Sequence, residues 1–284
     1  MEDFQPDYNK SLSTLEEEWN SCTKCELGVR RADVSGSFVF GEGTPGGIMF
    51  IGEGPGKDEE AMGRPFIGRS GQVLRNLIQK VGITRYYLTN IVACRACGQS
   101  YDTEGNPRFW KDRKTGAQVP VINDQAPTPA QMQECLPRLY QEIYSVDPIL
   151  IVALGGPASE TLTKGSIGVL AESGATRKIT IPGASHVPNL TDKRKVWARK
   201  VRGELIKPVD QSQVEYLMMP LVHPAYVLRK RKDERQGNPV EIFLDGMKKA
   251  ADIYDRYMFE VHGDHPGSRD LTESDFIEAQ QNDG

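Results

Sequence analysis

The chain has 284 residues, of which 38% are hydrophobic and 26% charged, and its formal net charge is −4. This size and composition fit one sizeable globular domain, and the odd number of five cysteines argues against a disulfide framework. We expect an intracellular, cytoplasmic protein with no membrane contact, because no apolar run is long and the residues after Met1 are acidic and polar.

Helical and strand patterns alternate along the chain. Helices are predicted over about 1–19, 70–82 and 128–143, and again after Pro239. Four apolar stretches predict buried strands at 48–51, 86–92, 149–154 and 216–222. This alternation predicts an α/β fold, a three-layer α/β/α sandwich around a mostly parallel four-stranded sheet.

Two segments interrupt this alternation, at about 98–125 and 174–214. We interpret them as insertions in a single domain that covers residues 1–258, the first as an inserted loop or small hairpin. The last segment, 259–284, holds seven acidic residues against Arg269 alone, so it carries −6 and the remainder of the chain +2. We expect this acidic tail to be disordered, with an unidentified protein as its candidate partner.

Basic residues gather in two clusters, at 193–202 and 229–232. Either cluster can hold phosphates, although a run of charges is more often a solvated surface. The negative net charge therefore does not exclude a nucleic acid as the partner.

A glycine-rich turn follows the first predicted strand. It reads Gly52-Glu53-Gly54-Pro55-Gly56, and a second glycine-rich loop runs from Gly63 to Gly71. Open α/β sheets bind ligands at the carboxyl ends of their strands. Glycine lets the backbone approach a flat or anionic ligand closely, and Glu53 adds a charge beside it. The sequence therefore predicts a binding site at this turn.

The cysteines offer two metal sites. Cys22 with Cys25, and Cys94 with Cys97, have the spacing of paired ligands, which favours a four-cysteine zinc site. The gap between the pairs is longer than in a zinc ribbon, however, and Cys135 is left over. In the alternative, Cys22, Cys25, Cys94 and Cys135 ligate a [4Fe–4S] cluster and Cys97 is spare. Spacing alone leaves both readings open, as well as a core role for some cysteines.

Several motifs occur in one order along the chain: Cys22-Thr23-Lys24-Cys25, the two glycine loops, Leu88-Thr89-Asn90-Ile91-Val92 before Cys94, Pro127-Thr128-Pro129 before Cys135, the strand at 149–155, and His223-Pro224-Ala225-Tyr226-Val227-Leu228-Arg229. In this order they resemble the family 4 uracil-DNA glycosylases, the iron–sulfur branch of the uracil-DNA glycosylase superfamily. The resemblance implies a [4Fe–4S] cluster on Cys22, Cys25, Cys94 and Cys135. The segment at 98–125 is longer than that family usually has.

The resemblance also implies roles in a base-flipping reaction. Phe66 would stack on the extruded base, and the amide of Asn90 would read the Watson–Crick edge of uracil, with the backbone of Gly54 as a further contact. His223 would stabilise the negative charge that develops on uracil O2 as the base leaves.

A water molecule must then attack C1′ of the sugar. Glu53 and Glu59 both lie on the first loop, and either can orient or deprotonate that water. Their positions in the sequence leave the choice between them open.

The resemblance extends to the DNA contacts beyond His223. The candidate residues are Leu228, Arg229, Lys230 and Arg231, with Leu228 or Tyr226 filling the gap left by the flipped base. The predicted function is a monomeric, monofunctional enzyme that hydrolyses the N-glycosidic bond of uracil in single- or double-stranded DNA and leaves an abasic site. Two alternatives stay open: a catalytically weak uracil- or DNA-binding module, and a glycosylase for another deaminated base.

Overall fold

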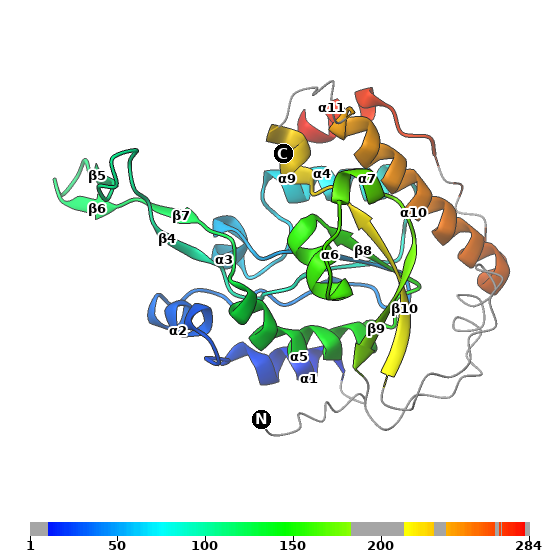
Figure 1. The fold of residues 1–284 in the computed structure, drawn as a ribbon, viewed down its shortest axis with the longest axis horizontal. Helices are drawn as coiled ribbons and strands as arrows, with labels where there is room; N and C mark the ends of the chain where they lie inside the picture. The colour runs from blue at the N-terminus through cyan, green and yellow to red at the C-terminus, as the bar shows by residue number, and fades with distance from the viewer. Residues whose placement is uncertain (1–10, 183–212, 230–236, 265–266, 268, 282–284) are drawn as a thin grey trace.

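A six-stranded sheet forms the centre of the protein (Figure 1). The computed structural model describes residues 11–182, 213–229, 237–264, 267 and 269–281. The strands follow the order β1 (Glu42–Gly43), β3 (Tyr86–Asn90), β2 (Ile48–Gly52), β8 (Leu150–Leu154), β10 (Gln213–Leu221) and β9 (Arg177–Pro182). The four inner strands run parallel, and β1 and β9 pair antiparallel at the two edges.

The four predicted strands are the parallel ones, so the α/β prediction is confirmed, whereas the two edge strands were not foreseen. β1 has two residues, too few for a pattern. β9 lies in the segment interpreted as the second insertion. It buries Ile179 and Ile181 and leaves Thr180 exposed. An edge strand with one buried face alternates and gives no continuous apolar run.

Alternate residues of the strands supply two hydrophobic cores, one on each face of the sheet. Ile48 and Phe50 face the core beneath α4, α10 and α11, whereas Met49 and Ile51 face the core beneath α1, α5 and α6. The helices are α1 (Leu12–Asn20), α2 (Glu26–Asp33), α3 (Lys57–Met62), α4 (Arg69–Lys80), α5 (Pro129–Val146), α6 (Gly156–Thr163), α7 (Val169–Glu172), α9 (Pro224–Arg229), α10 (Pro239–His262) and α11 (Glu273–Gln281). The three predicted layers are present.

The segment predicted as the first insertion forms an arm that projects from the body (Figure 1). At its base, β4 (Cys97–Gln99) pairs with β7 (Ile122–Asp124), and beyond them β5 (Phe109–Lys111) pairs with β6 (Gln118–Pro120). Both pairs are antiparallel.

Part of the acidic tail is ordered, so the prediction of disorder was wrong for the described residues. α10 ends inside the tail, and α11 packs against α4 with Phe276 and Ala279 buried. Lys80 Nζ donates to Asp275 Oδ1 at 3.0 Å and to Glu278 Oε2 at 2.6 Å. Burial of Phe276 contributes apolar contact for this docking, and Lys80 offsets part of the acidic charge of α11.

Some predictions lie outside the described residues. They concern most of the segment at 174–214, including the basic cluster at 193–202, and the residues Lys230 and Arg231. Within the described part of the chain, no helix combines the length and apolarity needed to cross a bilayer.

Candidate functional site

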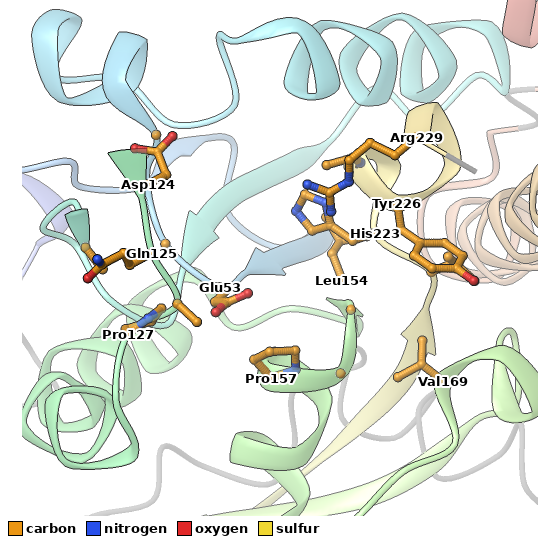
Figure 2. A pocket seen from close by; sticks show the side chains of 18 of the residues that line it. Glu53, Asp124, Gln125, Pro127, Leu154, Pro157, Val169, His223, Tyr226 and Arg229 are labelled. Carbon is orange, nitrogen blue, oxygen red and sulfur yellow. The ribbon is translucent and has the colours of Figure 1, made fainter. Parts of the chain in front are cut away.

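A cavity of about 570 Å³ opens at the carboxyl ends of β2, β8 and β10 (Figure 2). The segments at 53–56, 154–157 and 222–229 line it together with residues 124–127 at the base of the arm. Figure 2 shows Glu53 between two rims, with Asp124 to Pro127 on one side and His223 to Arg229 on the other. The cavity lies where the fold and the glycine turn predicted a ligand site.

His223 follows β10 directly, and its ring nitrogen Nδ1 accepts a hydrogen bond from the backbone amide of Ala225 at 3.1 Å. Nδ1 therefore carries the lone pair of the neutral imidazole, and Nε2 carries the proton. Burial, and after it the positive charge of Arg229, lowers the pKa of His223 to about 4. At neutral pH His223 is thus an uncharged ring that donates through Nε2.

Phe66 and Asn90 meet beside His223, around Gly52 at the end of β2. A Cβ atom at Gly52 would lie 2.4 Å from Asn90 Oδ1 and 2.7 Å from Phe66 Cζ, so only glycine leaves the two side chains room. The Phe66 and His223 rings are stacked with centroids 6.4 Å apart. Phe66 and Asn90 are both buried and adjoin the large cavity without lining it. The structure therefore brings the three predicted residues into one group.

A buried ion pair fixes the end of β3 that carries Asn90. Arg138 on α5 donates through Nη2 to the carbonyl oxygen of Asn90 at 2.6 Å and to that of the next residue at 2.7 Å. Its partner Glu142 also accepts from Tyr87 Oη at 2.9 Å and Thr89 Oγ1 at 3.0 Å. Arg138 thus positions Asn90 through its backbone.

Sequence reasoning missed Arg138 and Glu142. The available signal was their position, because an arginine and a glutamate four residues apart interrupt the apolar face formed by Leu136, Leu139 and Ile143. Charged side chains on the buried face of a helix need partners, and their presence there indicates a polar network.

The two candidate glutamates differ in their surroundings. Glu59 Oε1 accepts from the amides of Ile67 at 3.2 Å and Gly68 at 2.9 Å, and Oε2 accepts from that of Gly56 at 3.1 Å. Its carboxylate ties the two glycine loops together and does not line the cavity. Glu53 lines the cavity, its Oε1 is buried without a hydrogen-bond partner, and burial raises its pKa. The geometry therefore favours Glu53 for contact with a ligand or water.

The remaining candidates divide between the cavity and the core. Gly54 and Arg229 line the cavity, and so does Tyr226. Leu228 packs against the hydrophobic core on the α4 side of the sheet and is only partly exposed. Of the two residues considered for the gap left by a flipped base, Tyr226 is the one at the cavity.

The four cysteines predicted as ligands share one face of the sheet, and Cys25 and Cys135 are near enough to Cys94 to affect its thiol. Cys94 belongs to the hydrophobic core on the α5 side, and Cys22, Cys25 and Cys135 pack against that same core. Burial, and after it the neighbouring Cys135, raises the pKa of the Cys94 thiol to about 12. Cys97 lies on β4 of the arm and does not belong to that core.

The surroundings of these thiols are basic. The guanidinium of Arg31 interacts with Cys94, and that of Arg138 with Cys135. Both arginines are buried, and the Nε atom of each has no hydrogen-bond partner. The described residues include no three side chains close enough to hold a single metal ion. A four-iron cluster is larger than one ion, so its ligands stand farther apart.

The chain is similar in sequence to proteins of one superfamily. The sequence profile of the uracil DNA glycosylase superfamily matches residues 40–245. The type-4 uracil-DNA glycosylase of Thermotoga maritima is 29% identical over 242 residues, which are 84% of this chain and 92% of that protein. The protein of the same name from Archaeoglobus fulgidus is 29% identical over 154 residues, which are 53% of this chain and 63% of that protein. The one from Sulfurisphaera tokodaii is 33% identical over 149 residues, which are 51% of this chain and 54% of that protein. Because the profile covers well over half of its length, the chain belongs to the uracil-DNA glycosylase superfamily.

Proposed function

We propose that this chain is a monofunctional uracil-DNA glycosylase of type 4, which hydrolyses the N-glycosidic bond of uracil in DNA and leaves an abasic site. The observation that carries the proposal is the meeting of Phe66, Asn90 and His223 around Gly52, beside a cavity that exposes Glu53. The relatives named above are named for this activity, and the one from Thermotoga maritima matches 84% of the chain.

Phe66 and Asn90 select the base. Extrusion of a base from DNA costs a few kcal/mol, which stacking on Phe66 helps to offset. The Asn90 amide donates to uracil O4 and accepts from N3–H. Cytosine presents a donor at C4 and an acceptor at N3, so the same amide rejects it.

His223 and Glu53 act on the bond. As the glycosidic bond breaks, negative charge develops on uracil O2, and Nε2–H of His223 donates to that oxygen. A neutral donor suits this role because it keeps its proton throughout. The Glu53 carboxylate orients the attacking water toward C1′ and accepts its proton. Arg229 at the rim contacts a backbone phosphate, and Tyr226 fills the gap in the base stack.

A [4Fe–4S] cluster on Cys22, Cys25, Cys94 and Cys135 is part of the proposal. Four thiolates around such a cluster leave a net negative charge, and the buried guanidinium group of Arg31 has a positive charge that offsets part of it. The cluster would supply structural cross-linking, because its ligands come from the start of α2, the segment after β3, and α5.

Uracil release tests the activity. The purified protein should convert an oligonucleotide with one uracil into an alkali-labile abasic product. The Asn90→Ala variant should release uracil about tenfold to 10²-fold more slowly, because a bidentate contact to a base edge is worth about 1–3 kcal/mol. Asn76→Ala, which removes an amide at the contact of α4 with α11, is the matched control and should act as the wild type does. Tight binding of uracil DNA without release would instead identify a binding module.

Visible absorbance tests the cluster independently of activity. Protein purified without oxygen should be brown and contain about four irons per chain. Cys94→Ala should lose both the colour and the iron, whereas Cys97→Ala should keep them. A colourless wild-type protein with one zinc ion per chain would contradict the proposal.

A further inference from the structure

We propose that the arm formed by β4 to β7 binds the unpaired DNA strand that flanks the uracil. The inference rests on the proposed function and extends it to a part of the chain that takes no part in the cavity chemistry. The partner is recognised by the chemistry of the arm, which offers aromatic faces for bases and cations for phosphates.

The end of the arm combines exposed rings with basic side chains. Phe109 and Trp110 are 47% and 50% exposed, and they lie between Arg108 and Lys111 in the sequence. Large aromatic side chains on a two-stranded hairpin have no core to cover, so their exposure indicates a partner. Bases of single-stranded DNA present free faces on which such rings stack, whereas bases in a duplex are already stacked on each other.

Two of the four acidic residues of the arm, Asp102 and Asp112, are held within its own turns. Asp102 Oδ1 accepts from the amides of Glu104 and Asn106, each at 2.9 Å. Asp112 Oδ1 accepts from the amides of Lys114 and Thr115 at 2.8 and 2.7 Å. These carboxylates shape the two loops at the end of the arm.

The hairpin at 108–120 is positively charged. Its basic residues, all exposed, are Arg108, Lys111, Arg113 and Lys114, and with Asp112 as its one acidic residue it carries +3. A positive hairpin with exposed rings complements a nucleic acid strand better than it complements an average protein surface.

The base of the arm adjoins the cavity, so a DNA strand that leaves the cavity can continue along the arm. Arg95 Nε donates to Asp124 Oδ1 at 2.5 Å and anchors the base of β7 to the body. The residues that follow, Gln125 to Pro127, form one rim of the cavity, opposite Arg229. A strand whose uracil enters the cavity and whose phosphate meets Arg229 leaves over the opposite rim, along the arm. Residues 116–124, nine residues of largely extended chain, give the arm a reach of roughly 30 Å.

Binding of oligonucleotides of two lengths tests the proposal. The probes are single strands of 30 and 7 nucleotides with a central tetrahydrofuran abasic analogue, which cannot be hydrolysed. The double variant Arg108→Ala/Lys111→Ala should bind the 30-mer about tenfold more weakly than the wild type at 0.1 M salt. The salt dependence of its logarithmic affinity should be shallower by about 1.4, since about 0.7 is lost per phosphate contact on a single strand. The 7-mer, too short to reach the hairpin, should bind both proteins equally.

Two further variants complete the test. Trp110→Ala should also weaken the 30-mer roughly tenfold through lost stacking, without a change in the salt dependence. The matched control Lys249→Ala/Arg256→Ala removes two exposed cations from α10, at the other end of the molecule from the arm, and should leave both affinities unchanged (Figure 1). Equal binding of the 30-mer by the wild type and the Arg108→Ala/Lys111→Ala variant, or equal weakening on the 7-mer, would overturn the proposal.

The catalytic assay separates this failure from failure of the proposed function. Uracil release from a saturating 7-mer that carries uracil in place of the abasic analogue should proceed at the same single-turnover rate in the wild type and the Arg108→Ala/Lys111→Ala variant. If the wild type releases no uracil from the 7-mer, the proposed function fails. If release is normal and the Arg108→Ala/Lys111→Ala variant binds the 30-mer as the wild type does, only the proposal for the arm fails.

Discussion

Replacing His223 with alanine should lower the single-turnover rate of uracil release by about 10²–10³-fold, the usual cost of removing one hydrogen-bond donor aimed at a developing negative charge. Nδ1 of His223 is engaged by the amide of Ala225, so the donor is fixed at Nε2 before the substrate arrives. The loss should fall on the rate at saturation, because the oxygen gains its charge only in the transition state.

Two controls separate this role from a structural one. His262→Ala removes an exposed histidine from α10 and should keep the wild-type rate. His223→Gln places an amide donor near the same oxygen and should recover part of the rate lost in His223→Ala. A His223→Ala variant that releases uracil at the wild-type rate would contradict the assigned role.

Replacing Glu53 with glutamine should lower the rate by about 10²–10⁴-fold, the range for removal of a general base. Glutamine keeps the size of the side chain and its hydrogen-bonding capacity, so the fold and DNA affinity should stay unchanged. Asp58→Asn removes an exposed carboxylate from the first turn of α3, is the matched control and should have the wild-type rate.

The pH dependence of the rate distinguishes Glu53 from His223. Burial raises the pKa of Glu53 above its ordinary value of 4.5, so the carboxylate needed as a base is lost as the pH falls through that raised pKa. His223 stays neutral down to about pH 4 and adds no change near its ordinary pKa of 6.5. The wild-type rate should therefore decline on the acidic side with a midpoint above 4.5. A flat profile in Glu53→Gln would support the assignment, and an unchanged acidic decline would contradict it.

Much of the sheet and of the site was predictable because the signals are local. The four parallel strands are buried on both faces, so each appears in the sequence as a mostly apolar run. Their order then places the Gly52 to Gly56 turn, Asn90 and His223 at one edge. The roles of Phe66, Asn90 and His223 came from resemblance to a family, since each residue type alone is more often structural.

The features that escaped prediction depend on contacts between distant segments. Arg138 lies 48 residues from Asn90 in the sequence, so the bond between them exists only once α5 has packed on the sheet. Phe66 has a φ of 54°, a conformation that a bulky residue rarely adopts. The loop holds it there through Glu59 and through Arg75, whose Nε donates to the Phe66 carbonyl at 2.8 Å. Backbone strain that is held in place by such contacts leaves no local pattern in the sequence.

The Arg138–Glu142 pair restricts which substitutions the protein tolerates at these two positions. Both side chains are fully buried, so the loss of either one strands an opposite charge inside the protein at a cost of about 3–5 kcal/mol. Since domains have only about 5–15 kcal/mol of stability in total, a change at one position alone would remove a large part of it. We therefore expect the two residues to be kept together or exchanged together. A joint exchange for apolar residues would also remove the hydrogen bond that Arg138 donates to the Asn90 carbonyl.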